Sequence, residues 1–589
     1  MNKFSFILWI LFITISITDF AQVKNSLPDR QATYCNPMNL DYGYCPIPNF
    51  VQNGKHRATA DPVITVWKDK YFLFSTNQWG YWWSQDMKDW KFVSRKFLRP
   101  WNKVYDELCA PATVVLGDSL LVIGSTYEKN FTLWYSTNPT QDDWKIAVDS
   151  FQVGAWDPAL YLDDDNKLYL YGGSSNLYPI YGQELDRKTF APIGDRVPLI
   201  HLVDSVHGWE RFGENADNTF LRPFMEGAWM NKKNGKYYLQ YGAPGTEFSG
   251  YGDGAYVSDY PLGPFVYQKH NPISYKPGGF VRGAGHGATF KDVFQQYWHI
   301  STIAIGVKNN FERRNGVWPA NIDKDGILYT NTSYGDYPQY IPNANANHAQ
   351  SQFTGWMLLN YNKPVEVSST LSAYTANNAV DENIKTYWSA ISANKGEWIQ
   401  SDLGNQSTIE ALQINFADEA VELMGKQTNV YHQYQVFASE DKKVWKLIID
   451  KSKNHTDVPH DYVVLPKSIK ARFIKLVNIH MPTGKFAVSG LRVFGKGVGT
   501  NPGTVDNFVA LRGDSERRNA WLKWAVNPNA TGYHIYFGSS PDKLYNSVLL
   551  YGVSEYYCTA MDKDQTYYFQ IEAFNENGIG PRSPIKKAE

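Results

Sequence analysis

The sequence predicts an all-β protein whose first half, residues 30–345, is a five-bladed β-propeller, and two observations indicate this fold. Short segments rich in β-branched and aromatic residues flank polar turns, as residues 63–67 and 71–75 do around Lys68-Asp69-Lys70, and such pairs are typical of β-hairpins. The same order of strand, turn and aromatic strand recurs five times along this region. Five units of roughly 45–70 residues, each long enough for about four strands, are what a closed propeller requires.

The composition bounds the number of domains and excludes one class of partner. A chain of 589 residues is too long for one hydrophobic core and suggests three or four domains. The net charge of -1, with 20% charged residues, argues against a polyanionic partner such as a nucleic acid. Aromatic residues make up 15% of the chain, which fits β-sheet cores and also surfaces that stack on the apolar faces of sugar rings.

The N-terminal segment 1–21 is interpreted as a secretory signal peptide and is excluded from the fold. It carries one early lysine, an apolar stretch and a small residue, Ala21, suited to cleavage. The apolar stretch is short for a spanning helix and no second one follows, so we expect export to the periplasm or the cell exterior without a membrane span. In an oxidising compartment Cys35 and Cys45 are close enough in sequence to form a disulfide, and separate thiols are the alternative.

The first strand of each repeated unit begins with a related motif. The five motifs, in chain order, are Ala60-Asp61-Pro62, Cys109-Ala110-Pro111, Trp156-Asp157-Pro158, Glu226-Gly227-Ala228 and His286-Gly287-Ala288. A single Asp-Pro pair most often only opens a turn. Here, however, three of the five units place a carboxylate at the strand start, namely Asp61, Asp157 and Glu226. Because the first strand of each blade lines the central channel, we expect these acids to converge at its mouth.

The chemistry of three converging acids is distinctive. Three carboxyl groups in one partly desolvated cavity cannot all ionise without a large cost, so at least one of their pKa values should rise. A carboxyl group that keeps its proton beside one that loses it supplies an acid and a base. Glycoside hydrolysis uses such a pair, and the convergence of Asp61, Asp157 and Glu226 therefore predicts a glycosidase site.

These motifs also carry a family resemblance. From residue 36 to residue 329 the sequence resembles glycoside hydrolase family 43, and its most specific motifs are those around Asp61, Asp157 and Glu226. The resemblance implies that Asp61 is the general base that activates water and that Glu226 is the general acid. It implies that Asp157 orients the acid and tunes its pKa. The family inverts the anomeric centre, so the base and the acid should stand ~6.5–9.5 Å apart.

The resemblance also suggests a role for one histidine. His286, within Gly283-Ala284-Gly285-His286-Gly287, matches a position where family members hold a histidine near a central cation or its water shell. A packed core histidine is the alternative. No cofactor is expected to be required for the chemistry, and Ca²⁺ is the expected ion if a central or structural one is bound.

Contacts to the sugar are expected from arginine and tryptophan side chains. Arg313 or Arg314 lies where relatives present an arginine to the sugar, and a surface ion pair is the alternative for either. Trp79 and Trp156 are candidate stacking platforms, and packing between blades is the alternative for both. Trp156 is the better placed of the two, because it adjoins Asp157.

A polar loop precedes the fourth unit. Residues 208–215 resemble a loop in a branch of the family described as xylosidase or arabinofuranosidase, and we expect such a loop to wall off the pocket and impose exo action. A solvent-exposed loop is the alternative. Glu210 and Glu214 lie in this segment, but neither starts a strand, so neither is predicted to be the catalytic acid.

Beyond a polar linker the character of the sequence changes twice. Residues 365–497 resemble a discoidin-like (coagulation factor 5/8 C-type) β-sandwich, a module that in its relatives either binds sugars or braces an enzyme, and Asp381 is a candidate for holding a structural calcium. Residues 504–589 resemble a fibronectin type III β-sandwich, with alternating strands and an Asn-Gly turn near the end, and are expected to act as a spacer.

Together these features predict an exported, inverting exo-glycosidase that acts on terminal sugars of plant-type polysaccharide side chains. An α-L-arabinofuranosidase is the favoured activity. β-Xylosidase, β-D-galactofuranosidase and a non-catalytic glycan-binding propeller are the alternatives. The expected partner is a poly- or oligosaccharide, and the sequence predicts no oligomeric state.

Overall fold

The computed structural model describes residues 30–44, 55–76, 78–94, 108–126, 131–151 and 156–589, and residues 33–589 form one compact unit. The predicted signal peptide and Cys45 lie outside these residues. Cys35 is a free, buried thiol. Across the described residues every regular element is a strand, apart from two short 3-10 helices, η1 (Gly208–Glu210) and η2 (Ala376–Ala379). The predicted all-β class is therefore confirmed. No helix among these residues has the length and apolarity needed to cross a membrane.

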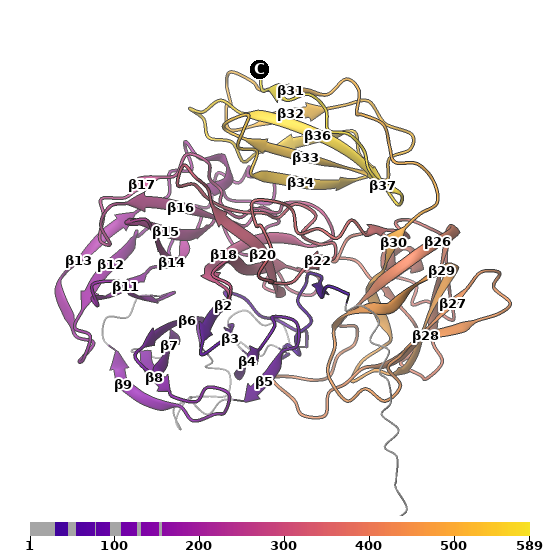
Figure 1. Ribbon diagram of the computed structural model, residues 1–589, viewed down its shortest axis with the longest axis horizontal. Coiled ribbons are helices and arrows are strands. Elements are labelled where there is room, and N and C mark those ends of the chain that lie inside the picture. The colour runs from indigo at the N-terminus through magenta and orange to yellow at the C-terminus, as the bar shows by residue number, and fades with distance from the viewer. Residues whose placement is uncertain (1–29, 45–54, 77, 95–107, 127–130, 152–155) are drawn as a thin grey trace, which may run out of the picture. The chain divides into compact units, whose positions relative to one another are not determined.

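The first half of the chain forms five antiparallel sheets of four strands, which we number as blades 1 to 5 (Figure 1). Blade 1 contains β2 (Val63–Trp67), β3 (Lys70–Phe74), β4 (Gly80–Ser84) and β5 (Lys91–Ser94), and blade 2 contains β6 (Cys109–Leu116), β7 (Ser119–Ser125), β8 (Phe131–Ser136) and β9 (Lys145–Phe151). Blade 3 contains β10 (Ala159–Leu162), β11 (Leu168–Gly172), β12 (Ile180–Leu185) and β13 (Pro192–Ile200). Blade 4 contains β14 (Glu226–Lys233), β15 (Lys236–Ala243), β16 (Gly252–Ser258) and β17 (Val266–Tyr267), and blade 5 contains β18 (Arg282–Lys291), β19 (Tyr297–Ala304), β20 (Arg313–Ile322) and β21 (Leu328–Thr330).

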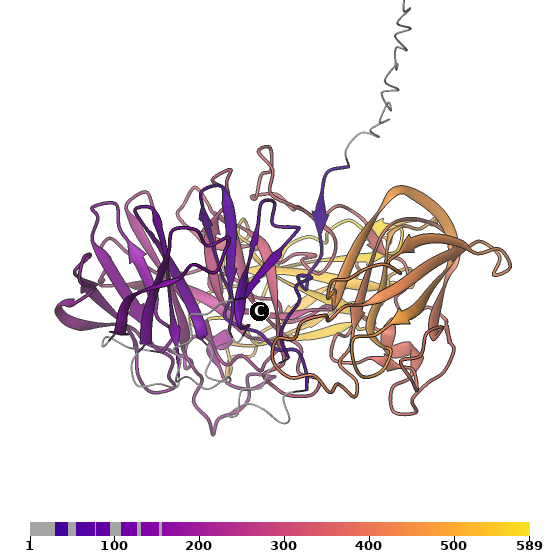
Figure 2. The same ribbon diagram turned by 90° about the horizontal axis from the view of Figure 1, so that it is seen from below.

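The blades close into a ring. The first strands contact one another in the order β2, β6, β10, β14, β18 and back to β2, so these five strands surround the centre of the ring. Figure 2 shows the blade strands from the side, running across the thickness of the ring. The short pair of β1 (Thr33–Tyr34) and β22 (Gln339–Tyr340) joins the two ends of the propeller region.

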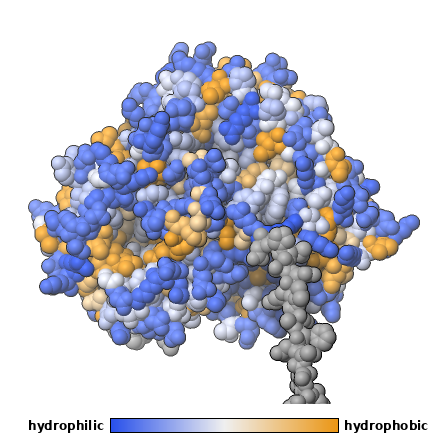
Figure 3. Space-filling model, viewed as in Figure 1, coloured by the Kyte–Doolittle hydropathy of each residue, from blue (hydrophilic) through white to orange (hydrophobic). Residues whose placement is uncertain are grey.

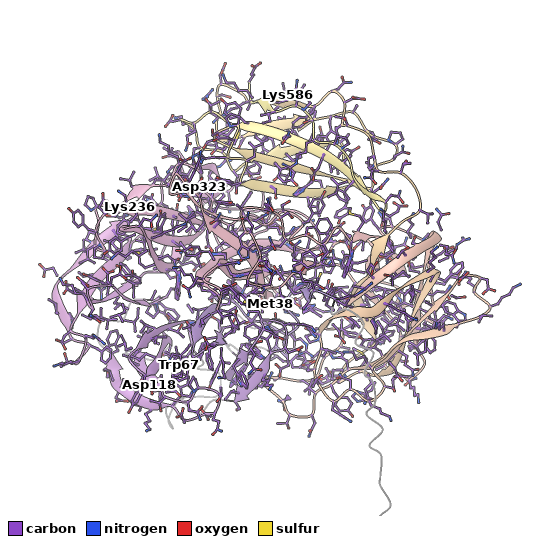
Figure 4. All side chains as sticks on the ribbon, viewed as in Figure 1. Met38, Trp67, Asp118, Lys236, Asp323 and Lys586 are labelled. Atoms are coloured by element: carbon purple, nitrogen blue, oxygen red, sulfur yellow. The ribbon has the colours of Figure 1, made fainter. Side chains whose placement is uncertain are left out.

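The hairpins at the far ends of the first strands follow from local sequence. In blade 1 the two-residue turn Lys68-Asp69 has positive φ at both positions (49° and 57°), the twist that matches a two-residue hairpin. The Lys68 ammonium, next to Trp67, pairs with the carboxylate of Asp118 in the turn of blade 2 at 2.5 Å, and Figure 4 shows Trp67 and Asp118 in neighbouring positions. These turns therefore lie together at one end of the ring, and the strand starts lie at the other.

The discoidin-like region forms a second all-β unit around one sheet system. Its elements are β23 (Met357–Leu358), β24 (Val365–Val367), β25 (Trp388–Ser389), β26 (Trp398–Phe416), β27 (Gln433–Ser439), β28 (Lys446–Asp450), β29 (His460–His480) and β30 (Ala487–Lys496). The long strands β26 and β29 pair with each other through register shifts at Asp402/Ser407 and Ile409/Ala411, irregularities of the kind that bend strands. The fully buried Trp388 and Leu412 lie in the core that results.

This sandwich is attached to the propeller region by a buried charge. The Arg492 guanidinium is 1% exposed and pairs with the Glu382 carboxylate at 2.9 Å. It also donates to the carbonyl oxygen of Asp336, at the end of the propeller region, at 2.6 Å. A buried guanidinium is stable only when its N–H groups have hydrogen-bond acceptors, so this contact requires both the Glu382 carboxylate and the Asp336 carbonyl oxygen.

The C-terminal residues form two facing sheets. One contains β31 (Val509–Leu511), β32 (Ala520–Lys523) and β35 (Glu555–Cys558), and the other contains β34 (Asn546–Tyr551), β33 (Gly532–Gly538), β36 (Tyr568–Asn575), β37 (Gly578–Ile579) and β38 (Lys586–Lys587). Leu522 and Ile535 pack in one hydrophobic cluster together with Trp209 and Tyr241 of the propeller region. The expected spacer is therefore a domain that packs directly on the propeller.

The first residues of the loop at 208–215 pack against the C-terminal sandwich, so they are not the solvent-exposed loop given as the alternative. The Gly208 amide donates to the carbonyl oxygen of Met561 at 2.9 Å, and the neighbouring His207 lies 2.8 Å from the Asp562 carboxylate. Glu210 is completely buried, where it accepts a hydrogen bond from the Tyr241 hydroxyl at 2.5 Å. Residues 207–210 thus form a docking segment for the C-terminal sandwich, because contacts with residues some 350 positions later in the chain cover them.

The surface in the view of Figure 3 is mainly hydrophilic, with scattered hydrophobic patches. Such a mixture is ordinary for folded proteins and by itself marks no site. The site is found instead at the strand starts of the blades.

Candidate active site

The start of the first strand has the same unusual backbone conformation in every blade. The left-handed positions are Asp61 (φ 50°), Ala110 (φ 45°), Asp157 (φ 54°), Gly227 (φ 68°) and His286 (φ 41°). Side chains other than glycine adopt this region at a cost of about 1–2 kcal/mol. Its recurrence at the same place in five blades shows that the ring architecture imposes it.

Hydrogen bonds between neighbouring blades support this conformation. In three blades the amide of the left-handed residue donates to a hydroxyl near the end of the second strand of the preceding blade. The pairs are Asp61 with Thr302 (2.9 Å), Ala110 with Thr76 (2.8 Å) and Asp157 with Ser125 (2.9 Å). In blade 4 the Gly227 amide donates instead to the Asp157 carboxylate at 3.3 Å. The strand starts are thereby linked to one another around the ring.

The three predicted acids converge on His286. The His286 Nδ1 atom lies 3.3 Å from the Asp61 carboxylate and 3.8 Å from the Asp157 carboxylate. Asp157, Glu226 and His286 each present a polar atom within 4.8 Å of the others. The structure thus brings together residues that are 225 positions apart in the sequence, because their blades are neighbours around the centre of the ring.

Asp61 is held from two sides. The Thr76 hydroxyl donates to its Oδ2 atom at 2.7 Å. The Arg313 Nη1 atom lies 4.0 Å from its Oδ1 atom and donates to the Thr246 hydroxyl at 2.8 Å. One oxygen of Asp61 is therefore fixed by a hydroxyl, while the other faces the imidazole of His286 and the guanidinium of Arg313.

Glu226 has a hydroxyl on each oxygen. The Tyr251 hydroxyl donates to Oε1 at 2.5 Å, and the Ser174 hydroxyl donates to Oε2 at 3.1 Å. The next residue must be glycine, because a Cβ atom at Gly227 would stand 2.7 Å from the His286 ring. The sequence Glu226-Gly227 therefore brings the acid and the imidazole as close as packing allows.

The charges of the site alter two pKa values. The pKa of Asp157 is raised to about 7, mainly by burial and also by the negative charges of Glu226 and Asp61, while His286 opposes the rise. Burial alone would lower the pKa of His286, but the carboxylates of Asp61 and Asp157 outweigh burial and raise it above its usual value. The expectation that at least one of the three acids has a raised pKa agrees with this arrangement.

A fourth acid, Asp253, holds His286 in its strained conformation from beneath the site. The Asp253 Oδ2 atom accepts a hydrogen bond from the Gly287 amide at 2.9 Å and lies 2.8 Å from the His299 Nε2 atom. Asp253 and His299 are both almost completely buried. They anchor the turn that carries His286, and neither was singled out from the sequence.

The donor set was compared with the expected calcium ion. Ca²⁺ prefers six to eight oxygen ligands, whereas the three side chains that lie close enough to share an ion, Asp157, Glu226 and His286, offer two carboxylates and one imidazole nitrogen. Both oxygens of Glu226 are already occupied by hydroxyl donors. These side chains therefore offer fewer free oxygen ligands than Ca²⁺ prefers. At the second expected position, Asp381, the carboxylate accepts from the Asn383 amide (3.0 Å) and the Thr386 hydroxyl (2.6 Å), so its oxygens serve its own turn.

The structure separates the two candidate arginines. Arg313 and Arg314 are successive residues of β20, so their side chains point to opposite sides. Arg313 faces Asp61, whereas Arg314 donates to the His460 imidazole of the discoidin-like sandwich at 3.0 Å. The expectation that Arg314 contacts the sugar was therefore wrong, because that side chain is covered by another domain.

The two tryptophans remain candidate stacking platforms. Trp156 is 39% exposed and directly precedes Asp157, and its ring makes an edge contact with Phe131 at 6.3 Å between centroids. Trp79 is half-buried, and its ring lies against Gly43, where an added Cβ atom would be 3.0 Å away.

Several residues around the acids were missed in the sequence. Thr76, Ser174 and Tyr251 all follow the second strand of a blade, and Glu247 lies in the same loop as Tyr251. Burial raises the pKa of Glu247, the charge of Glu226 raises it further, and Arg313 lowers it. A signal for them does exist: in an antiparallel hairpin the residues after the second strand lie at the same end as the start of the first.

Comparisons with known proteins agree with the motifs. The family model described as "Glycosyl hydrolases family 43" matches residues 49–328, and the "F5/8 type C domain" model matches residues 364–489. The two resemblances inferred from the sequence for these regions are therefore confirmed.

Individual relatives match only part of the chain. A "Beta-xylosidase" of Xylanibacter ruminicola is 32% identical over 134 residues, which cover 19% of this chain and 39% of the relative. An "Arabinoxylan arabinofuranohydrolase" of Bacillus subtilis (strain 168) is 32% identical over 167 residues, covering 26% and 30% respectively. The chain thus spans well under half the length of these curated relatives. Among solved structures, "Bacteroides ovatus Xyloglucan PUL GH43B" is 16% identical, with a TM-score of 0.43, over 78% of this chain and 97% of that one.

Proposed function

We propose that this protein is an inverting glycosidase that removes terminal α-L-arabinofuranosyl residues from plant polysaccharide side chains. The observation that carries the proposal is the meeting of three carboxylates from three different blades around one imidazole that is only 12% exposed. A structural role for such a cluster is hard to support, because gathering like charges in a buried site destabilises the fold. A function in acid–base chemistry accounts for the cost.

In this proposal Glu226 protonates the oxygen of the leaving group. The Tyr251 and Ser174 hydroxyls hold both of its oxygens and so define the direction in which the proton is delivered. Asp61 takes a proton from water on the opposite face of the sugar, and the Thr76 hydroxyl orients its carboxylate. Water then attacks the anomeric carbon as the bond to the leaving oxygen breaks, which inverts the configuration.

The remaining charged groups set the balance of protons. Asp157 accepts from the Gly227 amide, next to the acid, and its charge state influences Glu226 through their proximity. The carboxylates of the site raise the pKa of His286, and in its protonated form this imidazole offsets part of the repulsion among the three acids. Arg313 is the arginine proposed to contact the sugar, and Trp156 is the proposed stacking platform.

The choice of sugar is supported by the names of the relatives. Two of the matching proteins are described as arabinoxylan arabinofuranohydrolases and a third as a β-xylosidase. β-Xylosidase is therefore the second candidate activity. A pocket for either substrate must admit a single five-carbon sugar, as a furanose or as a pyranose ring, so the two activities differ in loop contacts and not in the acids.

The decisive experiment is release of p-nitrophenol from the α-L-arabinofuranoside, the β-D-xylopyranoside and the β-D-galactofuranoside, with Glu226→Gln as the matched variant. We expect cleavage of the arabinofuranoside by the wild type. In the variant we expect a loss of activity by a factor of about 10²–10⁴ on arabinoxylan, whose leaving oxygen needs a proton, and a smaller loss on the p-nitrophenyl glycoside, whose leaving group departs as an anion. Binding of sugars without cleavage of any substrate would favour a glycan-binding propeller instead.

Two finer expectations belong with this proposal. We infer that the C-terminal sandwich is of the fibronectin type III kind, which its facing sheets of β31-β32-β35 and β34-β33-β36-β37 support. We also infer export, which the apolar segment within residues 1–21 supports. Mass spectrometry of the secreted protein would test the cleavage after Ala21.

A further inference from the structure

Two segments that reach Asp61 are held by the discoidin-like sandwich. The first is the chain that enters blade 1, where Arg57 lies four residues ahead of Asp61. The second is the start of β20, where Arg314 adjoins Arg313, the arginine beside Asp61. Both segments end at the proposed base, and each carries one buried arginine directed at the sandwich.

Arg57 is fixed by two acids of the sandwich. Its guanidinium makes a two-pronged contact with the Asp457 carboxylate, at 2.5 Å from Nη1 and 2.9 Å from Nη2. Its backbone amide donates to the Asp418 carboxylate at 2.8 Å. The side chains of Arg57, Asp457 and Asp418 are 2%, 7% and 8% exposed. Charges this deeply buried must keep their partners, so the position of Arg57 depends on the sandwich.

Arg314 ties the two segments to each other and to the sandwich. Its Nη1 atom donates to the carbonyl oxygen of Arg57 at 2.7 Å, and its Nε atom donates to the His460 Nε2 atom at 3.0 Å. Burial and the nearby positive charges hold the pKa of His460 well below its usual value, which leaves its nitrogen free to accept. The His460 Nδ1 atom is in turn 2.8 Å from the Asn415 amide oxygen of the same sandwich.

We propose that the discoidin-like sandwich is a structural part of the active site, in which Asp457, Asp418 and His460 are positioning residues for Asp61 and Arg313. Among the described residues, Asp457, Asp418 and His460 make no hydrogen bond or ion pair with Asp157 or Glu226, the other two acids of the site. They act through Arg57 and Arg314, which fix the position and direction of the two segments that meet at Asp61. The inference rests on the proposed glycosidase function, because it assigns these contacts to the placement of the base.

The size of the effect follows from geometry. A displacement of about 1 Å of a catalytic group can lower a rate about 10²-fold, because the water and the base must be aligned at the moment of attack. Removing the charge of Asp457 takes away the two-pronged partner of the buried Arg57 guanidinium and leaves only Asp418, whose Oδ1 atom lies 3.7 Å from Nε, so residues 57–61 are expected to relax. Asp457 acts through Arg57 on the segment that carries Asp61, whereas Arg313, the proposed sugar contact, lies on β20, so the loss should appear in kcat and not in KM.

The test uses the full chain with Asp457→Asn and a matched control, Asp402→Asn. Asp402 makes a two-pronged contact with an arginine of the same sandwich, Arg472 at 2.8 Å and 2.8 Å. This pair is more exposed, at 19% and 43%, and within the described part of the chain it makes no hydrogen bond or ion pair with Arg57 or Arg314. We expect Asp457→Asn to lower kcat about 10–100-fold with KM within about threefold, and Asp402→Asn to change neither by more than about twofold. Circular dichroism at the assay temperature verifies that each variant is folded.

The possible outcomes are distinct. If the wild type hydrolyses none of the aryl glycosides, the proposed function fails and this inference falls with it. If the wild type is active and a folded Asp457→Asn variant keeps its kcat, or loses activity only through KM, the inference alone is overturned. Should Asp457→Asn not fold, Asp418→Ala carries the test with the same readouts, because it leaves the Arg57–Asp457 pair in place.

Discussion

Blades 1 and 2 begin alike and differ in one side chain. Asp61 and Ala110 both precede a proline and both adopt a left-handed backbone, with φ of 50° and 45°. Each donates its amide proton to a threonine hydroxyl of the preceding blade, at 2.9 Å and 2.8 Å. Where blade 1 carries a carboxylate, blade 2 carries a methyl group. The comparison teaches that this backbone does not need a carboxylate, so folding alone does not account for Asp61, the proposed base.

The strongest way to test this comparison is to give blade 1 the side chain of blade 2. Asp61→Ala should lower kcat about 10²–10⁴-fold, because the proposed base is removed. It should change the free energy of unfolding by no more than about 1 kcal/mol, since Ala110 shows that alanine is accepted in this conformation. Steady-state kinetics and denaturant unfolding measure the two quantities. A variant that unfolds would contradict the comparison, and a variant that stays active would contradict the assignment of the base.

A smaller effect is expected at the residue that the two blades share. The Thr76 hydroxyl donates to the Asp61 carboxylate and accepts from the Ala110 amide. Thr76→Val keeps the shape of the side chain, removes both bonds and should lower kcat about tenfold. It should also cost about 1–2 kcal/mol of stability, because the Ala110 amide is left buried without an acceptor. Thr76→Ser, which keeps the hydroxyl, is the control and should retain most of the kcat and most of the stability. Equal losses in Thr76→Val and Thr76→Ser would contradict the role given to the hydroxyl.

The smallest expected effect extends the comparison to blade 3, where the ionised carboxylate of Asp157 lowers the stability of the fold at high pH. Burial and the charges of Glu226 and Asp61 raise the pKa of Asp157 to about 7 in the folded protein, above its ordinary value of 3.8. A raised folded pKa contributes stability that is fully present below about pH 4 and is lost as the pH rises through about 7. Asp157→Asn cannot ionise, so its melting temperature relative to the wild type should rise between pH 4.5 and pH 8. A constant difference across that range would show that Asp157 does not titrate as the burial of its carboxyl group requires.

The sequence predicted the acids better than their surroundings. Asp61 and Asp157 could be found because each sits in a local Asp-Pro motif whose position in the repeat decides where it lies in the ring. Tyr251 and Ser174 lie in loops, and only the pairing of strands shows that they return to the same end of the blade. The sequence around Tyr251 and Ser174 contains no motif that marks either residue as part of a site.

Contacts between domains were beyond the reach of the sequence. Arg313 and Arg314 are equivalent as neighbouring letters, and what distinguishes them includes the contact of Arg314 with the sandwich residue His460, 146 positions later in the chain. Glu210 looked like part of a pocket wall, yet it is buried where the C-terminal sandwich docks. In both cases the deciding partner comes from a distant segment, and no periodicity or spacing within the propeller encodes it.

The most direct test of the central claim is the anomeric configuration of the first product. Proton NMR should follow the wild-type enzyme as it cleaves p-nitrophenyl α-L-arabinofuranoside, over the first minutes of the reaction. If Asp61 activates water opposite Glu226, β-L-arabinofuranose appears first and the α-anomer follows by mutarotation. Initial release of the α-anomer would contradict the account, because it would require a carboxylate to attack the sugar itself.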